Sequence, residues 1–180
     1  MNQKLNTPVS RSEIKQAFQE MDPEKSLGTD GFIGRLIKAC WKTIKRDSHK
    51  MVQNSHKSPK LSGSTNSAFL ALIPKDHNAS TFNRFQPLSL YNIGYKLITK
   101  VMVNKLREIL PKIIPANQGG FVRGRKITDN IILFQEAVHS SLSRREKGMV
   151  IKIDLANAFD RARHSFLCDV LSNYSFDAKF

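Results

Sequence analysis

The chain has 180 residues, enough for one ordinary domain or two small lobes, and its 40% hydrophobic content argues against global disorder. Lys and Arg together number 29 against 15 Asp and Glu, which gives a net charge of +14 and a pI near 10.0. Such an excess of positive charge favours a polyanionic partner, of which nucleic acid is the commonest.

Several other classes of protein fit the sequence poorly. No apolar run approaches transmembrane length, the N-terminus lacks the apolar core of a signal peptide, and neither a basic amphipathic helix nor a lipid anchor is evident. Cys40 and Cys168 lie far apart, which fits a reducing compartment, and no His pairs with a Cys at zinc-finger spacing. We therefore expect an intracellular protein with no membrane partner and no zinc site.

Residues 1–66 are expected to form N-terminal helices and a mobile loop. Ser10 and Glu13 fit a capping box in front of a short amphipathic helix. A helix over about residues 32–52 follows a Gly- and Asp-rich turn, whose Asp30-Gly31 pair, taken alone, indicates ordinary loop chemistry. The Ser- and Asn-rich stretch that completes the segment is interpreted as a mobile surface loop.

Two short apolar runs, residues 69–75 and 84–90, predict the strands of a β-hairpin. Pro87 places the second strand at a sheet edge or a bulge, because proline has no N–H to donate. Lys75 and Arg84 would then lie near the tip of the hairpin. Such a tip could contact a phosphate, although solvated lysines and arginines are the commoner case.

Residues 67–148 are expected to contain basic helices as well as the hairpin, and the clearest helix spans about residues 92–110. One of its faces is apolar. Another carries Lys96, Lys100, Asn104 and Arg107 at helical spacing. A basic stripe of this kind fits a phosphate backbone. The alternative is an ordinary solvated helix face, and the net charge of the chain favours the phosphate-binding interpretation.

A loop rich in Gly and Arg follows at residues 117–125. Phe121 offers a stacking surface, while Arg123 and Arg125 supply charge, a combination typical of loops that bind nucleic acid. It is not a Walker P-loop, because the Gly-Lys-Ser/Thr ending is missing. Thr128 or Asp129 can cap the next helix. The expected core stripe of that helix is Ile127, Ile131, Phe134, Val138 and Leu142.

The last segment, residues 149–180, begins with a predicted strand over residues 149–155. Alternation places Met149, Ile151, Ile153 and Leu155 on one face, which can pack on helices, and Asp154 on the other. A carboxylate at the end of a strand suits a hard divalent cation. The alternative is a solvated Asp on an edge strand, and these residues alone leave both interpretations open.

The order of these segments resembles the reverse transcriptase of plant LINE-type (non-LTR) retrotransposons over residues 14–180. Four motifs carry the resemblance: residues 26–32, similar to the Gly-Pro-Asp-Gly-Phe turn; residues 72–75 with 85–90, similar to the fingers hairpin; residues 118–130, similar to the Gln-x-x-Phe-x-x-Gly-Arg-x-x-x-Asp-Asn block; and residues 153–160, similar to the first palm motif. The third is the most specific. The implied fold is α+β: a fingers lobe with a hairpin, then the start of the palm.

The resemblance implies a role for individual residues. Asp154 would ligate two catalytic Mg²⁺ ions, with the Leu155 carbonyl on the nucleotide-side ion, and the ions would activate the primer 3′-hydroxyl and steady the leaving pyrophosphate. Phe159 would exclude a 2′-hydroxyl, and Lys75 would contact the triphosphate. The residues implied to line the template or support the palm are Gln118, Phe121 and Arg125. The implied partners are an RNA template, a DNA primer and a deoxynucleoside triphosphate, and elements of this family act on nuclear DNA.

The chain departs from the family pattern at several positions. Gln86 stands where the family has an Arg that grips the triphosphate, so nucleotide binding should weaken. Asn157 replaces a Lys, and no Phe/Tyr-x-Asp-Asp box occurs in the sequence. Because one carboxylate cannot hold two Mg²⁺ ions, we expect a partial RNA-directed DNA polymerase that is inactive alone. An unpaired palm strand would also favour self-association.

The alternatives are a non-enzymatic basic remnant that still binds nucleic acid, an unrelated basic protein with accidental matches, and a group II intron maturase. Two stretches favour a LINE-type reverse transcriptase over a maturase: Arg-Lys-Ile-Thr-Asp-Asn at residues 125–130 and Phe-Asp-Arg at residues 159–161.

Overall fold

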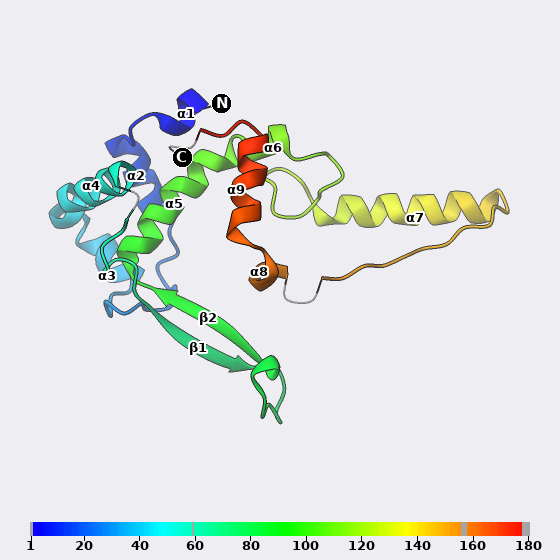
Figure 1. The fold of residues 1–180 in the computed structure, drawn as a ribbon, viewed down its shortest axis with the longest axis horizontal. Coiled ribbons are helices and arrows are strands. Elements are labelled where there is room, and N and C mark those ends of the chain that lie inside the picture. Colours follow the sequence, from blue (N-terminus) through cyan, green and yellow to red (C-terminus); the bar gives the residue numbers. More distant parts are fainter. Residues whose placement is uncertain (1, 59, 156–157, 178–180) are drawn as a thin grey trace. The chain divides into compact units, whose positions relative to one another are not determined.

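The computed structural model of the chain describes residues 2–58, 60–155 and 158–177 (Figure 1). In chain order the elements are α1 (Asn2–Asn6), α2 (Arg11–Gln19), α3 (Gly34–Ala39), α4 (Trp41–Lys57), β1 (Ala68–Pro74), a 3₁₀ turn (Phe82–Arg84), β2 (Phe85–Tyr91), α5 (Ile93–Arg107), α6 (Leu110–Ile113), α7 (Ile127–Ser143), α8 (Ala158–Arg161) and α9 (His164–Asn173). Two compact units result, one of Thr7–Asn104 and the other of Met1–Asn6 with Lys105–Phe180. The division falls in the last turn of α5. The segment boundaries expected after residues 66 and 148 stay predictions.

The core of the Thr7–Asn104 unit is made by α2, α4 and α5. The predicted capping box is confirmed: Ser10 Oγ accepts from the Glu13 N–H at 3.2 Å, and a Glu13 carboxylate oxygen accepts from the Ser10 N–H at 2.7 Å. The buried apolar side chains of the three helices pack together as one cluster with Val9, which lies just before α2. Its members are Val9, Ile14, Ala17, Phe18, Val52, Leu97, Ile98 and Val101. The amphipathic patterns read from the sequence therefore identified the core faces of α2 and α5 correctly.

The helix predicted over residues 32–52 is two helices, α3 and α4, which meet at Cys40. Cys40 has ψ 7°, so the backbone leaves helical geometry there and the two helices take different directions. The second helix also runs further than expected, to Lys57. Ser58 ends it with an extended backbone, as the residue before a proline favours.

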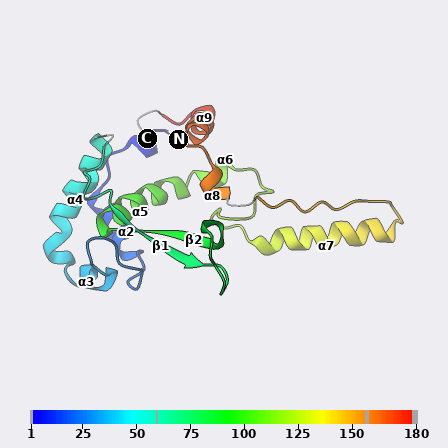
Figure 2. The same cartoon turned by 60° about the horizontal axis from the view of Figure 1, so that its bottom comes forward.

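The predicted hairpin is confirmed as an antiparallel pair of β1 and β2, in which Ile73 lies opposite Gln86 and Leu72 opposite Pro87 (Figures 1 and 2). The Lys75 N–H donates to the Arg84 carbonyl at 2.8 Å, so every second pair back from the tip is hydrogen-bonded. Pro74 and Pro87 occupy the intervening pairs, where a backbone N–H would point away from the partner strand. Both prolines therefore fit the sheet and block its outer edges.

Leu5, Ile109 and Phe176 form the small core of the other unit. The N-terminal helix α1 is tied into this unit by hydrogen bonds, among them Asn2 Nδ2 to the Ser175 carbonyl at 2.6 Å and the buried Lys105 ammonium to the Leu5 carbonyl at 3.1 Å. The long helix ends at Arg107, a little earlier than expected, and Pro111 lies in the first turn of α6, where a missing N–H costs nothing.

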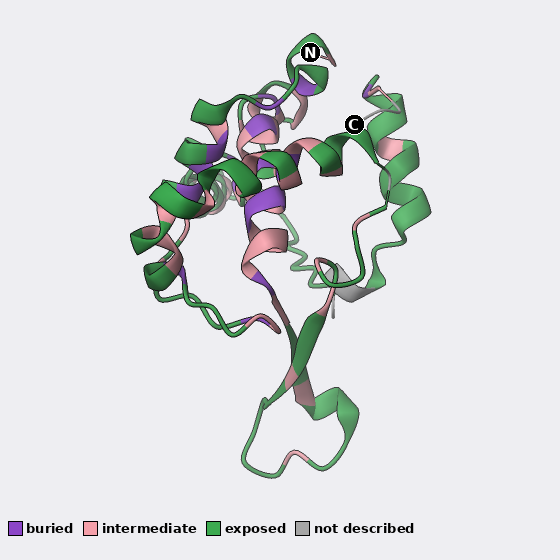
Figure 3. Ribbon diagram, turned by 90° about the vertical axis from the view of Figure 1, so that its left-hand side faces the viewer, coloured by how far each residue is buried: buried purple, intermediate pink, exposed green. Residues whose placement is uncertain are grey.

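Two predictions for this unit are wrong. The expected core stripe of α7 is exposed at Ile127, Ile131, Phe134 and Leu142, because no element of the described chain packs on it. Residues 149–155 form no strand, since the described residues offer no segment for them to pair with. Figure 3 shows how widely exposed residues extend beyond the small buried cores. Within the described residues, no helix is long and apolar enough to cross a membrane.

Candidate functional site

The hairpin tip holds Lys75 and Gln86, the two hairpin positions expected to contact the nucleotide, together with the basic residue Arg84. The Lys75 N–H donates to the Arg84 carbonyl across the tip, just beyond the paired strands, and Gln86 lies in the second pair of the sheet back from the tip. Lys75 is exposed, and its Nζ donates to the Asn83 carbonyl at 3.3 Å. Arg84 lies 3.7 Å from an Asp76 carboxylate oxygen. The tip is therefore cationic but partly neutralised, and Gln86 beside it is exposed to solvent.

The Gly- and Asp-rich turn is anchored to the root of the hairpin and the start of α5. Asp30 Oδ2 accepts from the Ile93 N–H at 2.7 Å, and Asn92 Oδ1 accepts from the Tyr95 N–H at 2.8 Å, so two side chains cap one helix. A Cβ on Gly28 would lie 2.2 Å from the Tyr91 carbonyl oxygen, so only glycine allows this approach. The turn thus fixes the direction in which β2 enters α5.

The predicted basic stripe of α5 is largely engaged within the chain. The Lys100 ammonium lies 3.0 Å from a Glu20 carboxylate oxygen, and Lys96 Nζ donates to the Ser26 carbonyl at 2.6 Å. Desolvation by partial burial lowers the pKa of Lys96. Hydrogen bonds from the Gln16 amide, and then from Lys100, lower the pKa of Glu20 to about 2. Arg107 is half-buried. A role of these residues in nucleic-acid binding stays a prediction.

The loop between α6 and α7 is folded around the guanidinium of Arg125. Its nitrogens donate to four backbone carbonyls, those of Ile114 at 2.7 Å, Gln118 at 2.9 Å, Pro111 at 3.2 Å and Pro115. A planar fork of donors suits such a set of acceptors better than any other side chain. Arg125 therefore stabilises the loop. The resemblance implied that it would either line the template or support the palm, and this geometry fits the supporting role.

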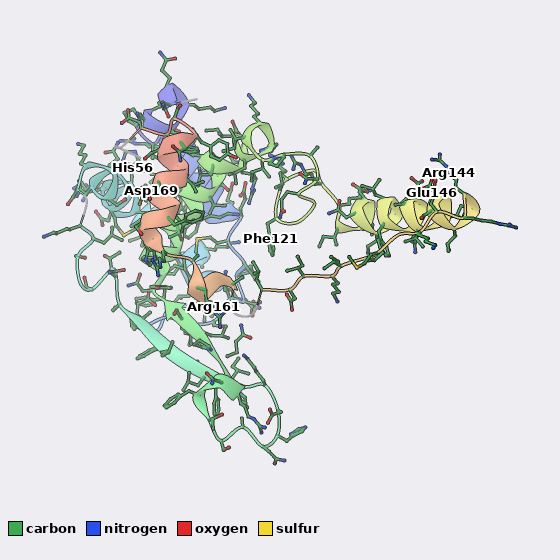
Figure 4. All side chains as sticks on the ribbon, turned by 45° about the vertical axis from the view of Figure 1, so that its right-hand side comes forward. His56, Phe121, Arg144, Glu146, Arg161 and Asp169 are labelled. Atoms are coloured by element: carbon green, nitrogen blue, oxygen red, sulfur yellow. The ribbon has the colours of Figure 1, made fainter. Side chains whose placement is uncertain are left out.

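Phe121 has the opposite orientation in this loop. Its side chain is fully exposed, and its φ of 61° is in the left-handed region, where a residue other than glycine is uncommon (Figure 4). The next residue, Val122, is buried. Gln118 and Arg123 are both exposed. The loop thus presents an aromatic ring and polar side chains to solvent over a buried valine.

Asp154 and Leu155 lie in an extended, solvent-exposed segment. Within the described residues there is no cluster of three or more His, Cys, Asp or Glu side chains that could hold a metal ion. Waters and substrate phosphates complete the shell of a protein-bound Mg²⁺, but one carboxylate and one carbonyl are too few to hold two ions, so the residues described do not fit a complete two-metal site. The side chain of Phe159 lies outside the described part of the chain.

Comparison with known proteins decides the family. Residues 73–179 match the family model described as reverse transcriptase (RNA-dependent DNA polymerase). The chain belongs to the reverse transcriptase family. It is part of a reverse transcriptase domain of the non-LTR retrotransposon type.

Three relatives illustrate this type. Over 99% of the chain, 30% of residues are identical to the Transposon TX1 uncharacterized 149 kDa protein of Xenopus laevis. The identity is 25% over 94% of the chain with the retrovirus-related Pol polyprotein from type-1 retrotransposable element R2 of Popillia japonica, and 23% over 89% with the probable RNA-directed DNA polymerase from transposon BS of Drosophila melanogaster. The chain spans 14%, 23% and 18% of these proteins, respectively.

The stretch matched by the reverse transcriptase model begins inside β1 and includes the hairpin tip, α5, the Arg125 loop and Asp154. Sequence reasoning missed the anchoring roles of Gly28, Asp30 and Asn92. An Asn just before a helix is a recognisable N-cap signal, so Asn92 could have been found. Asp30 and Gly28 could not, because their contacts lie more than 60 residues away along the chain.

Proposed function

We propose that this chain supplies the fingers and the first metal-binding carboxylate of an RNA-directed DNA polymerase from a plant LINE-type element, which works in the nucleus on an RNA template and a DNA primer. Lys75 contacts the triphosphate of the incoming deoxynucleotide, and Asp154 with the Leu155 carbonyl provides part of the oxygen set for Mg²⁺. The four motifs quoted from the sequence support the plant LINE assignment, and the family match supports the chemistry.

The observation that carries the proposal is the closeness of Lys75 and Arg84 at the hairpin tip, with Gln86 two residues into the second arm. Two cations at the ends of adjacent strands can flank a triphosphate, and a third side chain near them can reach it. With Gln86 at that third position the tip lacks one charge. Nucleotide binding by this chain is therefore expected to be weak but improvable at one residue.

Adding an arginine to each face of β2 in turn tests this proposal. Gln86→Arg adds a cation near Lys75, whereas Ser89→Arg adds the same charge to the opposite face of β2, because Ser89 lies three residues after Gln86 along the strand. Binding of a fluorescent deoxynucleoside triphosphate should tighten about tenfold in Gln86→Arg, roughly the effect of one charge-assisted contact, and little in Ser89→Arg. Equal tightening in both variants would show that only net charge matters and would refute the site.

The chain alone is expected to be inactive, because one carboxylate does not complete the magnesium site. The exposed segment 149–155 also leaves its backbone and apolar side chains without a partner in the described chain. We propose that copies associate through it. Sedimentation should show a concentration-dependent oligomer that Ile151→Lys with Ile153→Lys shifts to monomer, and an unchanged monomer at all concentrations would contradict this association.

A non-enzymatic nucleic-acid-binding remnant is the second candidate, and Phe121 favours it. A fully exposed ring held in a left-handed backbone conformation is available for stacking on a base. Phe121→Ala should weaken binding of single-stranded RNA about fivefold or more without lowering the melting temperature, since stacking on one base contributes roughly 1–3 kcal/mol. Unchanged RNA affinity in this variant would remove Phe121 from the binding surface.

A further inference from the structure

A groove between α2 and α4, within the Thr7–Asn104 unit, is lined by more positive charge than any other surface discussed above. Its volume is about 600 Å³. The residues that line it are Arg11, Ile14, Lys15, Trp41, Lys45, Arg46, His49, Lys50 and Gln53. Five of these side chains are cationic and none is a carboxylate, although none of them belongs to the motifs that carry the family resemblance.

The helical spacing explains how these residues come together. On α4, Trp41, Lys45, His49 and Gln53 recur every four residues and so form one row along the helix. Arg46 and Lys50 form the neighbouring row. Arg11, Ile14 and Lys15 of α2 share one face because they are three and four residues apart. Val52, seven residues after Lys45, lies in the core beside Trp41, so the row that begins at Trp41 borders the buried face of α4. Lys45, Arg46 and Lys50 are exposed.

The carboxylates of the same helices leave this charge largely uncompensated. Glu13 is occupied by the Ser10 N–H and Glu20 by Lys100. Asp47 reaches a groove cation only weakly, 3.9 Å from Arg46 Nε. Within the described residues, Arg11, Lys15, Lys45 and Lys50 have no ion-pair partner. Clustered like charges repel one another, so such an arrangement favours an anionic ligand.

The floor of the groove is apolar. The Trp41 ring is held against Phe18, with ring centroids 4.5 Å apart, and Ile14 is buried beside it. Trp41 and Lys15 also line an adjoining hollow of about 260 Å³, so the groove continues past the tryptophan. A tryptophan at the floor of a cationic groove provides a stacking surface between phosphate contacts.

We propose that this groove binds the phosphodiester backbone of a single-stranded nucleic acid, as a site additional to the nucleotide site proposed at the hairpin tip. Twelve residues of α4 separate Trp41 from Gln53, which corresponds to about 18 Å of helix, or about five phosphates of a stacked strand. A strand of this length matches the cationic side chains that the groove presents. A small phosphate compound would occupy only part of it.

The test is a matched pair of charge-reversal variants of the full chain. Lys45→Glu with Lys50→Glu changes the groove, whereas Lys42→Glu with Lys57→Glu makes the same charge change at exposed positions of α4 outside it. Binding of a fluorescein-labelled, mixed-sequence 15-nucleotide RNA is measured by anisotropy at several salt concentrations. Circular dichroism melting checks that both variants fold.

The groove variant should bind RNA about tenfold or more weakly, and the magnitude of its log–log salt slope should fall by about 1.4, while the control variant changes both quantities much less. Equal losses in the two variants would overturn the proposal. It would also be overturned if inorganic tripolyphosphate saturated the groove at lower concentration than the RNA, or if the groove variant lost binding to phosphatidylserine vesicles but not to RNA. The assay needs neither Mg²⁺ nor nucleotide, so its outcome is independent of the polymerase proposal.

Discussion

Arg125 offers a sharp test of the difference between a residue that contacts nucleic acid and one that holds a loop together. Arg125→Lys keeps the positive charge but replaces a planar fork that reaches four carbonyls with one ammonium group. Hydrogen bonds from a charged group contribute roughly 1.5–3 kcal/mol when a partner is removed. The lysine can keep some of these bonds and water can replace others, so we expect a loss of about 2 kcal/mol in the free energy of unfolding.

This loss corresponds to a decrease of roughly 4–8 °C in the melting temperature of a chain of this size. The matched control is Arg123→Lys in the same loop, because Arg123 is exposed and donates no hydrogen bond within the described residues. Thermal melting followed by circular dichroism, with RNA affinity measured in parallel, separates the two roles. If Arg125→Lys melts like Arg123→Lys, or loses RNA affinity without losing stability, the supporting role of Arg125 is refuted.

Three further predictions concern the Thr7–Asn104 unit. Gly28→Ala should lower the free energy of unfolding by about 1–3 kcal/mol, because the new Cβ meets a backbone oxygen 2.2 Å away, whereas Gly63→Ala, with open space around it, should not. The pKa of Glu20 is about 2, below its ordinary 4.5, so its stabilising effect is present above pH 4.5 and lost as the pH falls toward 2. When the pH is lowered from 6 to 2.5, the free energy of unfolding measured with urea should fall more in the wild type than in Glu20→Gln, by at most about 1 kcal/mol. Asp30→Ala should lower the free energy of unfolding, measured in the same way, by about 1 kcal/mol because it removes a cap of α5, and Asp30→Asn should lower it less.

The parts of the fold that were predicted correctly depend on neighbours in sequence. The Ser10 capping box needs only a three-residue spacing, and the hairpin needs two apolar runs with prolines at tolerated positions. The same local reasoning placed α5 and α7. It also identified the hairpin tip, since Lys75 directly follows β1 and Arg84 directly precedes β2.

The parts that were missed depend on distant contacts or on segments that the described chain does not provide. Residues 149–155 have the composition of a strand, but a strand exists only when it is paired. The apolar stripe of α7 has helical periodicity, but it is buried only when another element covers it. Arg125 and Phe121 belong to one Gly- and Arg-rich loop, and composition could not show that the first points inward and the second outward.

We propose above all that Asp154 is a working ligand of a polymerase metal site to which this chain contributes. The direct measurement is primer extension on an RNA template by a chimera in which this chain replaces the matching segment of an active reverse transcriptase of the same family. The account predicts that the chimera extends the primer in Mg²⁺, that Asp154→Ala abolishes extension while Asp47→Ala does not, and that the chain alone extends nothing. Extension by the chimera that survives Asp154→Ala would contradict the account, and so would extension by the chain alone.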